Sequence, residues 1–268
     1  GILYCLLSRG LGDVYKRQVW KAEIAAKILN IPIEILGDKP AEIPNWLWDT
    51  NPKKLSDDDK VKLAAFERKG KRGFNSSLYK SDKFLELIPF GTVPAAFSPD
   101  GSVGIFESNS ILRAIARQDE DGILYGKDSF EASRVDSFLD SNLVFSREHQ
   151  EYLFGLQDMN DFLYSRMKKA YEFFLNGIEE SLKKFKFIGF NHLTIIDISF
   201  FCDFSQFLRE GHYEEELKSK GFSLISENFP EDFPKSFNHL KELSKKGEFA
   251  STIGTYLNWY KKKVKNFN

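Results

Sequence analysis

Residues 89–117 read PFGTVPAAFSPDGSVGIFESNSILRAIAR, and this stretch carries the strongest structural signals in the chain. Residues 92–98 alternate apolar and small side chains as a strand does, and residues 102–106 return as a second short strand. Between them, residues 98–101 place Pro, Asp and Gly where a tight turn favours them. The sequence therefore predicts a β-hairpin.

A helix is predicted directly after this hairpin. Ile111, Leu112 and Ile115 recur at helical spacing, which leaves Glu107 and Ser108 at the start of the helix. The N–H groups of a first helical turn and the Ser108 hydroxyl can bind a carboxylate, while the Glu107 carboxylate can accept hydrogen bonds from an ammonium group. Since the head group of an amino acid carries both charges, the pattern indicates a site for one.

Pro94, inside the first strand, has two explanations. A proline removes one donor from a strand and is tolerated at an edge, a strand start or a bulge, with the usual trans bond. A cis Val93–Pro94 bond would instead turn the N–H and C=O of Val93 outward, where they can pair with an extended peptide. Glu107 also has a plain explanation, because an acidic residue at a helix start commonly complements the helix dipole.

The segments FGTVPAAF and GIFESNSILRAIAR, in this order, resemble the glutathione-binding half of the cytosolic glutathione transferases, close to the transferase-like domain of elongation factor 1-gamma. The resemblance implies an α/β plus all-α fold, with an N-terminal thioredoxin-like domain followed by an all-helical C-terminal domain. It also implies a cis Val93–Pro94 bond whose valine backbone pairs with the cysteinyl part of glutathione, while Glu107 and Ser108 bind the γ-glutamyl head. Val93, Pro94, Glu107 and Ser108 are therefore the predicted glutathione-binding residues.

Length and composition agree with two domains. The chain has 268 residues, of which 42% are hydrophobic and 15% aromatic, as in globular proteins. We expect a thioredoxin-like domain over residues 1–120, with an insertion at about 37–81, and an all-helical domain over residues 128–268. Two cysteines and four scattered histidines give neither a disulfide framework nor metal-ligand spacing, so we expect no metal.

The net charge of −1 gives no indication of a nucleic acid or an anionic membrane as partner. No apolar run approaches the roughly 20 residues of a membrane-spanning helix. We therefore expect a protein that binds neither nucleic acid nor membranes. The two cysteines, which suggest no disulfide framework, favour the reducing cytoplasm as its location.

The second domain shows clear helical patterns. Residues 163–182 place apolar side chains at three- and four-residue steps, which predicts a long amphipathic helix. Residues 193–208, LTIIDISFFCDFSQFL, are apolar on nearly every side, which is typical of a core helix. Thr194 and Asp197 can form a capping box at its start, as the resemblance also implies. Further helices are expected over residues 131–150, 237–245 and 250–261.

The N-terminal end supplies the start of the thioredoxin-like domain. Residues 19–29 and 31–36 predict a helix followed by a strand, and an apolar run over residues 2–7 can form the first strand before them. Residues 1–18, GILYCLLSRGLGDVYKRQ, also resemble a peptide translated from sequencing-adapter DNA. We therefore expect that the natural first strand and catalytic turn are replaced in this leader.

A transferase must stabilise the glutathione thiolate, because a free thiol is only a few per cent ionised at pH 7. In the family that the chain resembles, a Tyr, Ser or Cys between the first strand and the first helix does this. The leader offers Tyr4, Ser8 and Tyr15, of which Tyr15 lies nearest the helix start, but none falls in the family's pattern. No catalytic residue is therefore assigned from the sequence.

The segment over residues 37–81 is longer than the family's, and it holds an acid-started helix near residues 56–68 and the basic run RKGKRG. Thr92 stands where the family commonly has a lysine before the Val-Pro step. One hypothesis is that Lys71 or Arg72 binds the glycine carboxylate of glutathione in its place. The plain alternative is a solvated basic loop.

Three functions follow as hypotheses. The leading one is a glutathione transferase that conjugates glutathione, as co-substrate, to hydrophobic electrophiles in detoxification, working as a homodimer as the resemblance implies. The alternative is a non-catalytic binding or assembly domain related to elongation factor 1-gamma, with translation-factor partners. The third, a glutathione-dependent reductase or isomerase, would need a cysteine at the first turn, and Cys5 lies before that position.

Overall fold

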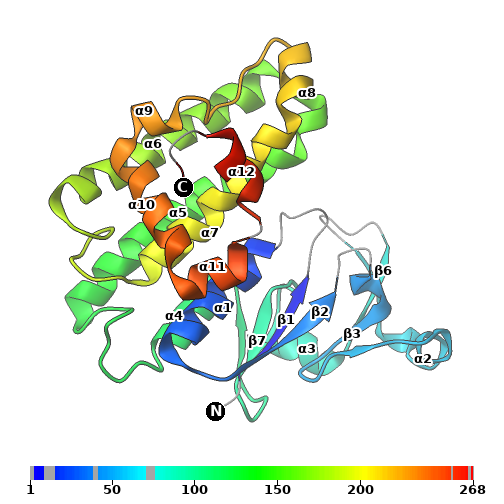
Figure 1. The fold of residues 1–268 in the computed structure, drawn as a ribbon. Coiled ribbons are helices and arrows are strands. Elements are labelled where there is room, and N and C mark those ends of the chain that lie inside the picture. Colours follow the sequence, from blue (N-terminus) through cyan, green and yellow to red (C-terminus); the bar gives the residue numbers. More distant parts are fainter. Residues whose placement is uncertain are drawn as a thin grey trace. The chain divides into compact units, whose positions relative to one another are not determined.

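The computed structural model describes residues 3–8, 16–38, 42–70, 76–254, 256–264 and 267, with side chains from Val19 onward (Figure 1). The chain divides into two compact units, Gly1–Ile115 and Ala116–Asn268. Tyr15, Lys71 and Arg72 lie outside the described residues.

The first unit is built on a four-stranded sheet with the strand order β2-β1-β7-β8. Strand β1 pairs in parallel with β2 and antiparallel with β7, which pairs antiparallel with β8. This mixed sheet and its helices form the predicted thioredoxin-like fold, with the predicted hairpin as β7 and β8 and the predicted first strand as β1. Its elements are β1 (Leu3–Ser8), α1 (Lys16–Leu29), β2 (Ile33–Asp38), α3 (Asp82–Leu87), β7 (Ala95–Phe97), β8 (Gly104–Phe106) and α4 (Ser108–Ala116).

The segment between β2 and α3, where the sequence predicts an insertion, forms a second sheet with the strand order β4-β3-β6-β5. Its elements are η1 (Ile43–Asn45), β3 (Trp46–Trp48), β4 (Lys53–Lys54), α2 (Asp57–Lys62), η2 (Ala64–Phe66), β5 (Glu67–Lys69) and β6 (Ser77–Lys80). The helix expected near residues 56–68 begins with a capping box of Ser56 and Asp59 but ends at Lys62, because residues 67–69 pair with β6 instead.

An aromatic chain joins the insertion to the first sheet. The ring of Trp48 packs edge-on against Phe84 of α3 at 5.8 Å between centroids, and Phe84 packs against Phe97 of β7 at 6.1 Å. All three side chains are almost fully buried, and Ile43 and Leu78 from the insertion belong to the same core cluster. The insertion therefore contributes to the hydrophobic core of the first unit.

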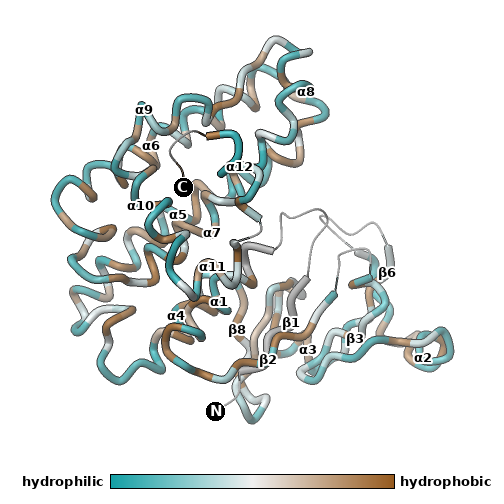
Figure 2. The backbone as a smooth tube through the Cα atoms, in the orientation of Figure 1, coloured by the Kyte–Doolittle hydropathy of each residue, from teal (hydrophilic) through white to brown (hydrophobic). Residues whose placement is uncertain are grey.

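The second unit is helical, as predicted, and α7 lies at its core. All thirteen residues of α7 are buried, while α6 alternates hydrophobic and hydrophilic residues along its length (Figure 2). The helices are α5 (Ser129–Phe154), η3 (Leu156–Asp158), α6 (Asp161–Lys184), α7 (Ile195–Phe207), η4 (Leu208–Tyr213), α8 (Glu214–Ser219), α9 (Phe229–Asp232), α10 (Pro234–Lys245), α11 (Gly247–Ile253) and α12 (Asn258–Lys263).

The start of α7 confirms the predicted capping box. The Asp197 carboxylate accepts the backbone N–H of Thr194 at 2.8 Å and that of Ile188 at 3.0 Å, and its Oδ1 lies 2.8 Å from Nε2 of His239. The single helix expected over residues 250–261 was wrong, since α11 ends before Gly254, a poor helix former, and α12 starts at Asn258. Within the described residues, no helix is both long and apolar enough to cross a membrane.

Candidate functional site

The Val93–Pro94 peptide bond is cis, as the resemblance implied, and it lies between α3 and β7. Pro94 is buried, whereas Val93 is half-buried. Among the residues that the structure describes, none forms a backbone hydrogen bond with Val93. The described part of the chain therefore leaves the N–H and C=O of Val93 for another extended backbone.

Glu107 and Ser108 lie at the start of α4, where the sequence places them. Ser108 is the first residue of the helix, and the carbonyl of Glu107 accepts the N–H groups of Ser110 and Ile111, each at 3.0 Å. Glu107 has a φ of +66°, in the left-handed region that residues other than glycine rarely occupy. A backbone held in this region is characteristic of binding and catalytic sites.

The register of the hairpin brings these two pairs of residues together. Ala95 of β7 lies opposite Phe106 of β8. The Val93–Pro94 step directly precedes Ala95, and the Glu107–Ser108 pair directly follows Phe106. Since neighbouring strands lie about 4.8 Å apart, both pairs meet at the same end of the hairpin. All four residues named from the sequence therefore belong to one locality.

Lys80, at the end of β6, is a cation that the sequence analysis missed. Its Nζ donates a hydrogen bond to the carbonyl oxygen of Gly91 at 2.7 Å, two residues before Val93, and lies 4.8 Å from the centre of the Trp48 ring. The sequence signal that could have identified Lys80 is its position directly before Ser81, the N-cap of α3. The residues predicted to bind the glycine carboxylate, Lys71 and Arg72, lie outside the described residues.

None of the residues considered for the catalytic role has a described side chain. Tyr4, Cys5 and Ser8 belong to β1, of which only the backbone is described, and Tyr15 lies outside the described residues. Among the described residues, no group of three or more His, Cys, Asp or Glu side chains is placed to hold a metal ion.

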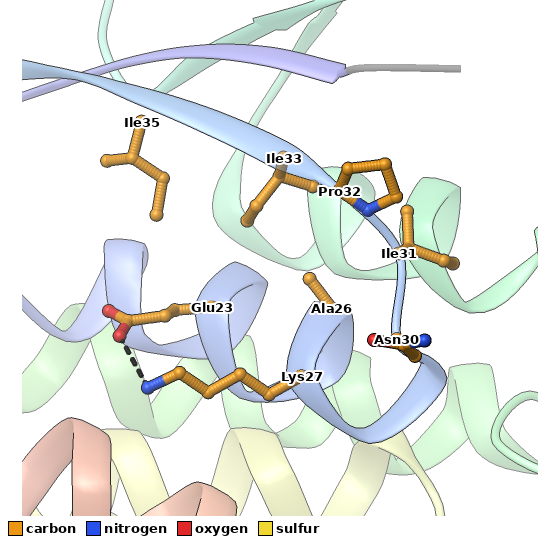
Figure 3. A pocket seen from close by; sticks show the side chains of 8 residues that line it. All are labelled: Glu23, Ala26, Lys27, Asn30, Ile31, Pro32, Ile33 and Ile35. Atoms are coloured by element: carbon orange, nitrogen blue, oxygen red, sulfur yellow. Dashed lines mark ion pairs between the residues drawn. The ribbon is translucent and has the colours of Figure 1, made fainter.

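A hollow of about 510 Å³ lies elsewhere in the first unit, between α1 and the edge strand β2 (Figure 3). Glu23 and Lys27 form an ion pair of 2.8 Å at its rim. Its lining is Glu23, Ala26, Lys27, Asn30, Ile31, Pro32, Ile33 and Ile35, which includes none of the four predicted residues. The hairpin end, and not this hollow, is therefore the candidate site.

Comparison with solved structures shows the fold of the glutathione transferases. The glutathione transferase URE2P8 from Phanerochaete chrysosporium, solved with oxidized glutathione, superposes with a TM-score of 0.64 at 15% identity, covering 97% of this chain and 96% of that one. Poplar glutathione transferase F1 gives 0.63 at 14% identity, covering 96% and 99%. A transferase from Methylobacillus flagellatus KT with GSH bound gives 0.60 at 14% identity, covering 93% and 98%.

Similarity in sequence is partial and points to a translation factor. Elongation factor 1-gamma 1 of Oryza sativa subsp. japonica is 38% identical over 61 residues, which is 23% of this chain and 14% of that protein. Elongation factor 1-gamma of Prunus avium is 27% identical over 132 residues, 46% of this chain and 30% of that protein. The chain thus matches less than a third of the length of these relatives. No family model matches the sequence.

Proposed function

We propose that this protein is a glutathione transferase that binds glutathione at the end of the β7–β8 hairpin and conjugates it to hydrophobic electrophiles. The observation that supports the proposal is the pairing of Ala95 with Phe106, because Val93 lies two residues before Ala95 and Glu107 directly follows Phe106. A peptide extended along Val93 can exchange backbone hydrogen bonds with it through its cysteinyl residue. Its γ-glutamyl head then reaches the start of α4.

The charges of the site suit both ends of glutathione. The hydroxyl and the backbone N–H of Ser108 are donors for the γ-glutamyl carboxylate, and the Glu107 carboxylate is an acceptor for the ammonium group. Lys80, close to Gly91 on the other side of Val93, provides a cation for the glycine carboxylate. Conjugation requires in addition a donor that stabilises the thiolate and holds it near the electrophile.

Glu107→Gln tests the binding site. The substitution removes the negative charge that faces the ligand's ammonium group while keeping the size of the side chain. We expect the dissociation constant for glutathione, measured by titration calorimetry, to rise about tenfold, as for loss of a hydrogen bond to a charged group. Glu86→Gln, on the exposed face of α3, is the matched control and should bind as the unaltered protein does. Equal affinities of both variants would contradict the proposed site.

The second candidate is a non-catalytic assembly domain with translation-factor partners, and the sequence matches to elongation factor 1-gamma favour it. The two candidates differ in chemistry. A transferase should conjugate glutathione to a general aromatic electrophile. Glutathione binding without conjugation would favour the assembly domain. Under either function we propose that the protein is cytoplasmic and forms a homodimer. Light scattering of the purified protein would test the homodimer.

A further inference from the structure

Lys21 in α1 is a buried cation that the proposed function has not used. Its side chain is almost completely enclosed, with 1% of the residue exposed, and its neighbours Ala22, Ile24 and Ala25 belong to the core. An ammonium group removed from water is costly unless polar groups compensate it. Lys21 therefore needs polar groups within hydrogen-bond distance of its ammonium group.

The ammonium group of Lys21 reaches the first turn of α4. Its Nζ donates a hydrogen bond to Oδ1 of Asn109 at 2.8 Å, across 88 positions of sequence. Asn109 is itself only 5% exposed and directly follows Ser108. A charge-assisted hydrogen bond of this kind is short and strong, so it ties the second residue of α4 to the middle of α1.

The turn that leads into α4 contains a strained backbone. Glu107 has a φ of +66°, and backbone in this region persists only where the surrounding structure determines it. The hydrogen bonds from Ser110 and Ile111 to the Glu107 carbonyl hold this residue from the helix side. The contact between Lys21 and Asn109 holds the same turn from the side of the core.

We propose that Lys21 is a positioning residue for the γ-glutamyl site: it acts through Asn109 to fix the first turn of α4, and thereby the side chains of Glu107 and Ser108. This inference rests on the proposed function for its ligand, whereas its structural half does not depend on any ligand. A role limited to joining α1 and α4 would lower the stability of the fold without changing which part of glutathione is recognised.

The experiment compares Lys21→Met with Lys27→Met, a matched control on the same helix. The side chain of Lys27 is 37% exposed, and its ammonium group pairs with Glu23. Asn109→Ala removes the acceptor and serves as a second variant if Lys21→Met does not fold. Hydrogen exchange of the backbone amides of Ser110 and Ile111 is measured without ligand. Affinities are then measured for glutathione and for cysteinylglycine, which lacks the γ-glutamyl head.

We expect the amides of Ser110 and Ile111, which donate to the Glu107 carbonyl, to exchange about tenfold faster in Lys21→Met, while the strand amides of β7 and β8 keep their rates. We expect the preference for glutathione over cysteinylglycine to fall on the order of tenfold in Lys21→Met and in Asn109→Ala, without a further loss in the double variant. Lys27→Met should change neither quantity.

Unchanged local exchange in a folded Lys21→Met protein would overturn the inference, and so would an unchanged preference for glutathione despite faster exchange. If the unaltered protein binds neither ligand, the proposed function fails. In that case the exchange rates alone decide whether Lys21 fixes the turn.

Discussion

At the scale of single residues, Lys80 offers a direct test of how the ligand lies. Its ammonium group is held near Gly91, and in the proposed site it binds the glycine carboxylate of glutathione. We expect Lys80→Met to weaken binding of glutathione about tenfold, and to leave unchanged the binding of glutathione whose glycine carboxylate is an amide. Lys83→Met, an exposed residue of α3, is the control. An equal loss for both ligands in calorimetry would contradict this assignment.

Glu210 in the second unit predicts a dependence on pH. Its buried carboxylate accepts hydrogen bonds from Tyr152 Oη at 2.8 Å, Ser226 Oγ at 2.6 Å and the N–H of Ser226 at 2.7 Å. Burial nevertheless raises the pKa of Glu210 above its ordinary value, because desolvation penalises the charged form more than these donors favour it.

A raised pKa in the folded state means that the folded protein binds the proton more tightly than the unfolded chain. The stability from this group is therefore fully present below the ordinary pKa of 4.5 and is lost as the pH rises through the folded value. We expect the free energy of unfolding of the unaltered protein to rise relative to Glu210→Gln as the pH falls from 7 towards 5. Urea unfolding at several pH values measures this, with the exposed Glu215→Gln as control. A difference independent of pH would refute it.

The four residues at the hairpin end show how much of the candidate site could be predicted from the sequence. They were named from the resemblance of the two segments that contain them, and the hairpin register brings the two pairs to one end of the hairpin. The left-handed backbone of Glu107 was not predictable, because it depends on the turn into α4 and on contacts from other elements. Lys80 was missed for a similar reason, since its contact with Gly91 exists only once the insertion folds against α3.

At the scale of elements, two capping boxes of the same kind lie in opposite environments. The box of Thr194 and Asp197 at α7 is fully buried, whereas that of Ser56 and Asp59 at α2 is exposed and begins a helix without buried residues. We expect Thr194→Ala to cost about 1 kcal/mol of unfolding free energy. Asp197→Ala should cost about 3 kcal/mol or more, since it leaves buried donors unsatisfied.

Ser56→Ala is the control for this comparison. It should lower the unfolding free energy by a few tenths of a kcal/mol at most, because loss of α2 exposes no apolar side chain that the rest of the first unit buries. Chemical unfolding of the three variants gives the values. A loss for Ser56→Ala as large as that for Thr194→Ala would show that burial does not decide the effect.

Elements were predictable where they are long and periodic. Helix α6 and the core helix α7 follow from apolar spacing alone, as does the hairpin from its turn residues. The second sheet was not predicted, because its strands have two to four residues and too few alternations to give a period. Their pairing is decided by tertiary packing of Trp48 and Leu78 in the core.

At the scale of the whole molecule, the division into two units predicts that a core substitution destabilises one unit and leaves the unfolding of the other unchanged. Trp48→Ala removes a ring that is 1% exposed and packs on Phe84 in the first unit. We expect it to destabilise that unit by about 3–5 kcal/mol, as for other large-to-small changes in cores. Calorimetry should show one unfolding transition shifted down and the transition of the helical unit retained. Leu240→Ala, fully buried in α10, should do the reverse.

The pairing of Ala95 with Phe106 fixes the position of Glu107 along the hairpin relative to Val93. One residue removed from either arm would shift Glu107 by about 3.3 Å along the strand direction and turn its side chain to the opposite face. Changes of length between residues 94 and 107 are therefore tolerable only in compensating pairs.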